Sequence, residues 1–202
     1  MSWELWALAS MVVLVLLGWY LLFSATRLDR LHRRVEGAQA ALDNQLLRRA
    51  TAATELAGSG VLDPASSLLV AGAAVQAIEA GEGRAAQIAL DPFSGSRLAD
   101  HDADRESAES DLSRALRATL DTLPDDDPAV AAGHLEPLSA VVHRVCLARR
   151  FHNDAVLQAQ SVRRKRVVRW ARLAGRAPVP QTLELDDEPP RVLMPRGMAS
   201  RR

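Results

Sequence analysis

Residues 5–23 read LWALASMVVLVLLGWYLLF and contain no charged side chain. At about 1.5 Å per residue, a helix of this length spans roughly 28 Å, which matches the hydrocarbon core of a bilayer. Aromatic residues occupy both ends of the stretch, as they do at membrane interfaces; they are Trp3, Trp6, Trp19, Tyr20 and Phe23. The stretch predicts a single transmembrane helix that tethers the rest of the chain.

A cleaved signal peptide and a buried helix of a soluble protein are the alternatives to this anchor. A signal peptide has a basic start, a shorter apolar core and a cleavage site of small residues. Here residues 1–4 contain no Lys or Arg, and residues 23–26 read Phe-Ser-Ala-Thr. A soluble core helix rarely contains an uncharged run of this length. Both alternatives are therefore disfavoured.

The flanking charges predict how the anchor is oriented. Only Glu4 precedes it, whereas four arginines follow it closely: Arg27, Arg30, Arg33 and Arg34. The side richer in Arg and Lys faces the cytoplasm. We expect a single-pass protein of the cell membrane, with its N-terminus outside and its C-terminal domain in the cytoplasm. The single Cys146 cannot form an internal disulfide, which agrees with a reducing compartment.

The chain after the anchor favours helix over strand, because it is rich in Ala, Leu, Arg, Asp and Glu. Apolar residues at 3–4 spacing predict four helices. The first runs over residues 24–58 and continues the anchor. The second, with an apolar stripe of Leu68, Leu69, Val75 and Ile78, runs over 63–80 and breaks at Gly81 and Gly83. A shorter helical piece through Ile88 follows, and Asp91-Pro92 ends it. The third and fourth cover 100–123 and 128–173.

Short loops between these helices favour an all-α fold, an antiparallel four-helix bundle whose spine is the first and fourth helices. We predict three parts: an anchor over 1–24, a cytoplasmic bundle over 25–175, and a flexible, disordered C-terminal tail over 176–202. The tail contains five prolines and few large apolar residues, so we expect it to bury no core.

Polar residues interrupt the apolar stripes late in the first and fourth helices. The set comprises Arg48, Arg49, Arg149, Arg150, His152, Asn153 and Asp154. If the two helices are antiparallel neighbours, Arg49 and Asp154 are placed to form an ion pair inside the bundle. A partly buried pair of this kind fixes register more often than it performs chemistry. We therefore interpret these residues as structural or as partner contacts.

Charge is unevenly distributed along the chain. Residues 91–127 contain eleven Asp or Glu against four Arg, and residues 163–176 contain seven basic residues and no acid. The basic run suits anionic lipid headgroups or nucleic acid, although cations also simply complement the C-terminal dipole of a helix. A membrane tether favours lipid or a protein partner over nucleic acid. The candidate contacts are Arg163, Arg164, Lys165, Arg166, Arg169 and Arg172.

No motif of catalysis, cofactor binding or metal binding stands out. No two histidines have the i,i+3 or i,i+4 spacing of a helical metal site, and no phosphate-binding glycine loop or nucleophile elbow occurs. Cys146 borders an apolar stripe and is interpreted as a core residue rather than a reactive thiol. The leading hypothesis is a non-catalytic scaffold that binds a protein partner. The alternatives are an anionic-lipid-binding module, or a metal-dependent enzyme using His101, Asp102 and Asp104 or a site near His152.

Two segments about a hundred residues apart resemble the LemA family. The first has the pattern V-x-x-A-x-x-x-L-D-x-Q-L-x-R-R over residues 35–49, and the second reads ARRFHNDAV over residues 148–156, where the family motif is A-R-R-x-Y-N-D-A-V. The resemblance, which covers about a third of the chain with the anchor included, implies an antiparallel four-helix bundle on one membrane anchor, with no established catalytic activity. His152 stands where the family has Tyr, and the family's D-L-I-P-N-L after the arginine pair is replaced by residues 52–56. The chain is identified as a divergent member.

Overall fold

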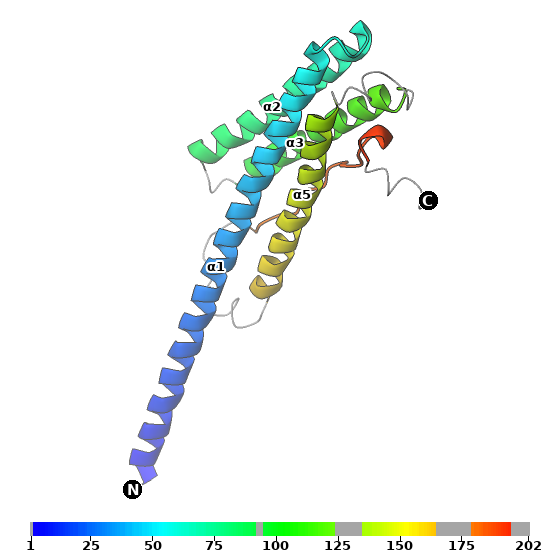
Figure 1. The fold of residues 1–202 in the computed structure, drawn as a ribbon. Coiled ribbons are helices and arrows are strands. Elements are labelled where there is room, and N and C mark those ends of the chain that lie inside the picture. The colour runs from blue at the N-terminus through cyan, green and yellow to red at the C-terminus, as the bar shows by residue number, and fades with distance from the viewer. Residues whose placement is uncertain (1, 92–94, 124–134, 165–178, 195–202) are drawn as a thin grey trace.

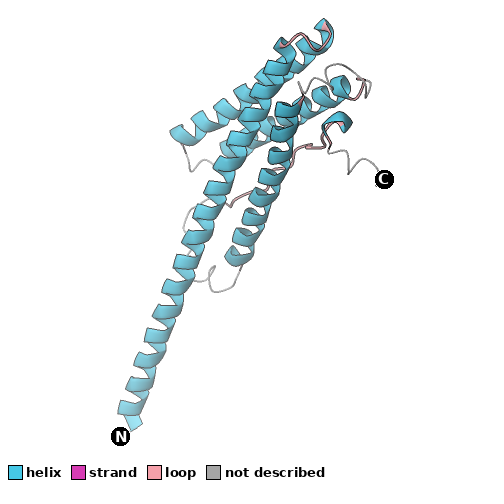
Figure 2. Cartoon of the chain, viewed as in Figure 1, coloured by secondary structure: helices cyan, strands magenta, loops and turns pink. Residues whose placement is uncertain are grey.

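The structure, a computed structural model, describes residues 2–91, 95–123, 135–164 and 179–194. These residues form the α-helices α1 (Ser2–Gly58), α2 (Pro64–Leu90), α3 (Gly95–Leu120) and α5 (Glu136–Arg163), and the 3-10 turn η1 (Arg191–Leu193). No strand occurs in these ranges (Figure 2). The prediction of an all-α fold is therefore confirmed for the described residues.

The predicted anchor and the first predicted helix of the domain form one continuous helix of 57 residues, α1. Its N-terminal part extends away from the other helices (Figure 1). The most apolar 18-residue window of α1 has a mean hydropathy of 2.2, and no part of it is buried against the rest of the chain. The helix is long and apolar enough to cross a membrane, and its C-terminal half belongs to the folded domain.

The helices pack as two pairs. α5 runs antiparallel to α1 and forms the expected spine, and α2 and α3 form a hairpin that lies obliquely across the upper part of α1 (Figure 1). Asp63 caps α2 by accepting hydrogen bonds from the N–H groups of Ala65 and Ser66 at 3.0 and 3.2 Å. The turn before it uses Gly60, which has a φ of 77° that favours glycine. α3 packs mainly on α2, and α5 mainly on α1.

The predictions for α2 were wrong in two respects. The helix continues through Gly81 and Gly83 to Leu90, because packing along α3 outweighs the cost of about 1 kcal/mol per glycine. Its buried face consists of Val70, Ala74 and Ala77, whereas the larger predicted residues Leu68, Leu69 and Val75 are exposed. Small buried side chains allow α2 to approach α1 and α3 closely.

The other helix boundaries differ at their ends. Residues 95–100, expected to lie in a loop, form the first turns of α3, which ends at Leu120 rather than 123. The predicted fourth helix is α5, and residues 128–134 and 165–173 of that prediction lie outside the described residues, as do the candidate contacts Lys165, Arg166, Arg169 and Arg172. The apolar residues whose 3–4 spacing predicts these two helices are buried, except for the half-buried Leu123. They are Leu112, Leu116 and Leu120 in α3, and Leu138, Val142, Val145 and Val156 in α5.

The C-terminal segment contradicts the expectation of a tail that buries no core. Residues 179–194 cross the domain between α3 and α5, drawn from orange to red in Figure 1. Leu183, Leu185 and Leu193 are each at most 7% exposed. The composition of the tail predicted no buried core because it contains few large apolar residues. Three leucines are enough to bury this segment when the rest of the domain supplies hydrogen-bond partners for its backbone.

Candidate functional site

The candidate site is the groove between α3 and α5. Residues 179–194 lie in it as an extended stretch of chain that ends in η1. We call this stretch the strap segment. It makes no regular ladder with another backbone, so the hydrogen-bonding groups of its own backbone need other partners. Side chains from both helices provide these partners along its length.

α5 holds the strap segment with four polar side chains that point into the groove. Asn153 pairs with both backbone groups of Leu183: its Nδ2 donates to the carbonyl oxygen at 3.2 Å, and its Oδ1 accepts from the N–H at 3.0 Å. Gln160 donates to the carbonyl of Pro180 at 2.8 Å, and Ser139 donates to that of Leu193 at 3.0 Å. Arg149 binds the Asp187 carboxylate with two bonds of 2.9 Å.

α3 supplies the opposite wall of the groove. Glu106 Oε1 accepts from the N–H of Glu184 at 2.8 Å, and Ser110 Oγ accepts from the N–H of Asp186 at 3.1 Å. Arg117 binds both carboxylate oxygens of Asp186, one of them at 2.8 Å, and also donates to the Glu188 carbonyl at 2.8 Å. Bidentate pairing of arginine with carboxylate fixes orientation as well as charge.

Apolar side chains anchor the strap segment between its polar contacts. Leu183 and Leu185 join a cluster with Leu42, Leu46 and Val145. Leu193 belongs to the main core, to which α3 and the start of α5 also contribute. Glu184, between the two buried leucines, is exposed. This alternation is the pattern of an extended chain lying on an apolar surface.

The electrostatics of the groove follow from these contacts. The hydrogen bond from Arg117 holds the pKa of Asp186 below its ordinary value, and the same bond raises the pKa of Arg117. Burial raises the pKa of the Cys146 thiol, which donates to the Asp187 carbonyl at 3.4 Å. Cys146 therefore stays protonated at neutral pH, which agrees with the interpretation of an unreactive thiol.

A buried ionic network fixes the position of α1 against α3 behind the groove. Arg49 and Glu109 are each 2% exposed and form a pair of 2.5 Å, and Arg49 also donates to Ser113 Oγ and the Glu109 carbonyl at 2.9 Å each. The predicted partner of Arg49, Asp154, is exposed instead. The prediction failed because α3, rather than α5, faces Arg49.

A second set of ion pairs surrounds Asp43 on α1. Arg105 of α3 binds Asp43 at 2.7 Å, and Arg84 of α2 lies 3.8 Å from it while also binding Asp102 of α3. Asp102 is one of the residues of the alternative metal-site hypothesis, and here it is held by an arginine. Among the described residues, no group of three His, Cys, Asp or Glu side chains is arranged to hold a metal ion.

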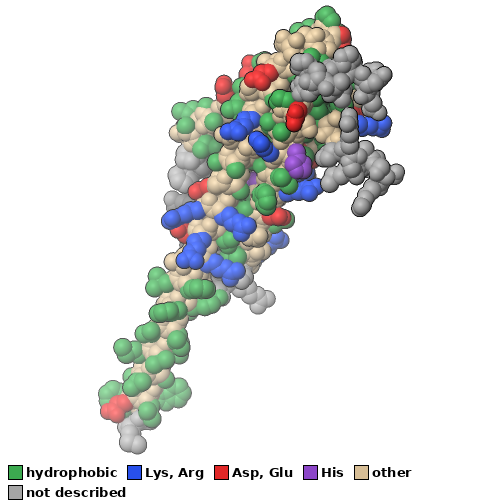
Figure 3. All heavy atoms as spheres, viewed as in Figure 1, with side chains coloured by type: hydrophobic (Ala, Val, Ile, Leu, Met, Phe, Trp, Pro, Cys, Tyr) green, Lys and Arg blue, Asp and Glu red, His purple; other side chains and the backbone are tan. Residues whose placement is uncertain are grey.

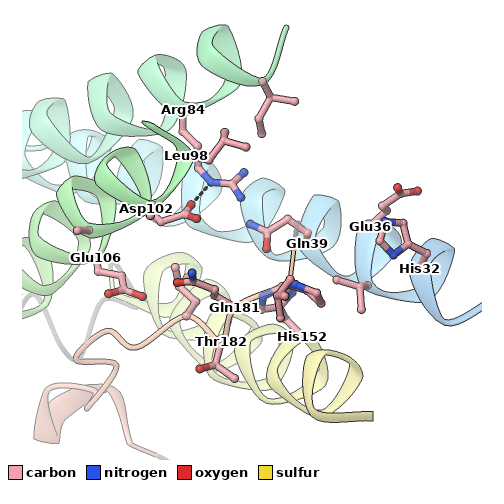
Figure 4. Close-up of a pocket in the computed structure, with 17 residues that line it drawn as sticks. His32, Glu36, Gln39, Arg84, Leu98, Asp102, Glu106, His152, Gln181 and Thr182 are labelled. Atoms are coloured by element: carbon pink, nitrogen blue, oxygen red, sulfur yellow. Dashed lines mark hydrogen bonds and ion pairs between the residues drawn. The ribbon is translucent and has the colours of Figure 1, made fainter. Parts of the chain in front are cut away.

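A cavity of about 630 Å³ with polar and apolar lining residues opens at the anchor-side end of the groove, where four helices and the start of the strap segment meet (Figure 4). His152 lies at its floor and is 3% exposed. Burial lowers the pKa of His152, against a smaller opposing effect of a hydrogen bond with the Gln181 backbone. Its Nδ1 has no hydrogen-bond partner among the described residues, so the neutral imidazole suits the site.

Seven polar residues were predicted to interrupt the apolar stripes of the first and fourth helices. Three of them lie at the groove or its cavity: Arg149, His152 and Asn153. Arg49 belongs to the buried network, and three others are exposed: Arg48, Arg150 and Asp154. Sequence reasoning missed Glu106, Ser110, Arg117 and the strap segment itself. The alternation Leu183-x-Leu185, followed by two aspartates, was the available signal.

Arginines gather at the anchor-side end of the domain, directly above the apolar stretch (Figure 3). The antiparallel packing of α5 on α1 brings Arg163 and Arg164 to the level at which α1 leaves the apolar stretch, and Arg34 donates to Gln158 Oε1 at 3.0 Å across the two helices. We call the arginines at this end of the domain the basic collar; they are Arg27, Arg30, Arg33, Arg34, Arg163 and Arg164.

Comparison with family models, with curated proteins and with solved structures gives no match for this chain. The groove, the basic collar and the apolar N-terminal part of α1 are therefore the features that bear on function.

Proposed function

We propose that this protein is a non-catalytic helical scaffold, tethered to the cytoplasmic face of the cell membrane by α1, that binds a protein partner. The observation that carries the proposal is the groove between α3 and α5, whose side chains are arranged to hold an extended stretch of polypeptide. The excess of arginine after the anchor supports a cytoplasmic domain.

The chemistry of the described side chains supports binding rather than catalysis. The Cys146 thiol is protonated and hydrogen-bonded to a carbonyl, so it is a poor nucleophile. His152 is buried beneath Gln181, and Asp102 and Glu106 are occupied by Arg84 and by the N–H of Glu184. The polar groups of the site are thus used to hold chain segments together.

We also propose that the chain is a divergent LemA-type protein. Support comes from the placement of its two motif segments, which face each other on α1 and α5. Leu42 and Leu46 of the first motif share a cluster with Val145 and border Ala148, where the second motif begins. Val35 packs with Ala155 and Val156 of the second.

Affinity capture of the full chain from detergent-solubilised membranes tests the scaffold proposal. The control is a chain of residues 1–34, which keeps the anchor and the arginines that follow it but lacks the domain. We expect a protein that co-purifies with the full chain only and that rebinds it from purified components. Equal recovery with both chains would contradict the proposal.

Protease added outside intact cells should leave the domain uncut if it is cytoplasmic.

The basic collar favours a second candidate function, binding of anionic lipid headgroups beside the anchor. Clustered arginines near a bilayer surface each contribute on the order of 1 kcal/mol. A chain lacking residues 1–24 should float with vesicles of anionic phospholipid but not with neutral ones, and added salt should weaken the binding. Changing Arg163, Arg164, Lys165 and Arg166 to Gln should reduce it. Absent or salt-insensitive flotation would count against this function.

A further inference from the structure

The strap segment occupies its groove in the manner of a bound peptide. Its contacts with the helices combine side-chain hydrogen bonds to its backbone, two buried leucines and two arginine–carboxylate pairs. These are the elements by which grooves recognise extended partners, with backbone contacts providing affinity and alternate side chains providing specificity. A helix or strand of the domain would instead be held by its own ladder of backbone bonds.

The occupant is held in a way that permits exchange. The Arg117–Asp186 and Arg149–Asp187 pairs keep between 19% and 35% of each side chain exposed, so water reaches both. Ion pairs that water reaches are weaker and open more readily than fully buried ones. The strap segment adds Leu193 to the main core, and Leu183 and Leu185 to the cluster of α1 and α5 residues. The helices also have apolar contacts without it, since Val35 of α1 packs on Ala155 and Val156 of α5, and α2 packs along α3. Release of the strap segment therefore leaves these contacts between the helices in place.

We propose that the groove between α3 and α5 is the docking site for an extended segment of a partner protein that carries two alternating leucines followed by two carboxylates, and that residues 179–194 occupy it in cis until displaced. This inference rests on the proposed function and names the chemistry of the partner. Charge complementarity carries the assignment, because the groove offers two arginines to two adjacent carboxylates. A segment attached to the same chain competes at an effective concentration on the order of millimolar.

The test uses the full chain in detergent micelles and a fluorescent peptide with the sequence of residues 179–194, followed by anisotropy. Asp186→Asn with Asp187→Asn in the chain weakens only the cis occupant, because the groove itself is unchanged. We expect this variant to bind the wild-type peptide roughly tenfold more tightly than the wild-type chain does, since the fraction of chains with an empty groove rises by that factor. Glu184→Gln is the matched control; it removes a carboxylate that faces solvent, and it should bind the peptide as the wild-type chain does.

A charge exchange separates recognition from general loosening. Arg149→Asp repels the cis Asp187, so this chain should reject the wild-type peptide and accept a peptide that carries Asp187→Arg. Circular dichroism verifies that each variant keeps its helix content. Equal peptide binding by the wild-type chain and the Asp186→Asn, Asp187→Asn chain would overturn the proposal, and so would acceptance of both peptides by the Arg149→Asp chain.

Two further outcomes distinguish the source of the occupant. If the wild-type chain has the mass of a dimer that becomes a monomer on addition of the peptide, the groove belongs to a second copy, and the assignment to a separate partner is wrong. If a partner captured by the full chain still binds the Arg117→Ala, Arg149→Ala chain, the scaffold function stands and the groove is not its docking site.

Discussion

Loss of the Arg49–Glu109 pair should destabilise the domain more than loss of any surface charge. Both side chains are 2% exposed, and Arg49 places three hydrogen bonds on Glu109 and Ser113. Removing one partner leaves the other charge buried without its counter-ion. We therefore expect Arg49→Met or Glu109→Gln to lower the free energy of unfolding by about 3–5 kcal/mol.

The double variant decides whether the buried charge is the cause. Arg49→Met with Glu109→Leu removes both charges and fills the site with apolar atoms of similar volume. Since burying an ion pair costs desolvation energy that apolar side chains avoid, the double variant should lose less stability than either single variant. Arg48→Met, one residue away on the exposed face of α1, is the control and should change stability by less than about 0.5 kcal/mol.

Thermal unfolding in micelles, followed by circular dichroism, measures these differences. A change of 1 kcal/mol shifts the Tm of a domain of this size by about 2–4 °C, so each single variant should melt about 6–20 °C lower. Single-variant losses that simply add in the double variant would refute the buried pair. Coupling of Arg49 to Asp154 in a separate double-mutant cycle would instead support the pairing expected from sequence.

Three further predictions concern the groove. Because burial lowers the pKa of His152, the unfolded chain binds this proton first as the pH falls below the ordinary value of 6.5; the difference in Tm between the wild-type chain and His152→Gln should therefore shrink or reverse between pH 7.5 and 5.5. Arg117→Ala removes the ion pair with Asp186, so trypsin should cut after Arg191 several-fold faster while the helix content is unchanged. Equal cleavage rates in the two chains would contradict a role of this ion pair in holding the strap segment. Cys146 is the only cysteine, and its alkylation in Asp186→Asn, Asp187→Asn should be faster than in the wild-type chain, since release of the strap segment frees the thiol; a match to the Glu184→Gln rate would argue against release.

Periodicity predicted the helices well where their buried faces are large and apolar. The stripes of α1, α3 and α5 follow 3–4 spacing, and Leu42, Leu112 and Val156 are each fully buried as expected. The same rule failed for α2, because it assumes that the largest side chains face inward. Close approach of α2 to its neighbours selects Ala74 and Ala77 for the interior and leaves Leu68 exposed.

Pairing between distant residues could not be derived from sequence. Arg49 has carboxylates available on several helices, and only the oblique crossing of the α2–α3 hairpin over α1 brings Glu109, rather than Asp154, to it. The strap segment posed the same difficulty, since its prolines and charges have the composition of a disordered tail. Its order comes from partners 20–78 positions away in the chain, such as Gln160 and Glu106.

The apolar N-terminal stretch, the arginines that follow it and the helical character of the domain are evident from the sequence alone, because each depends on residues that are near one another in the chain. Tertiary structure decided which carboxylate neutralises Arg49, which face of α2 is buried, and that residues 179–194 fill the groove between α3 and α5. Those outcomes depend on where whole helices cross, and a crossing is set by the fit of many side chains at once rather than by any local pattern.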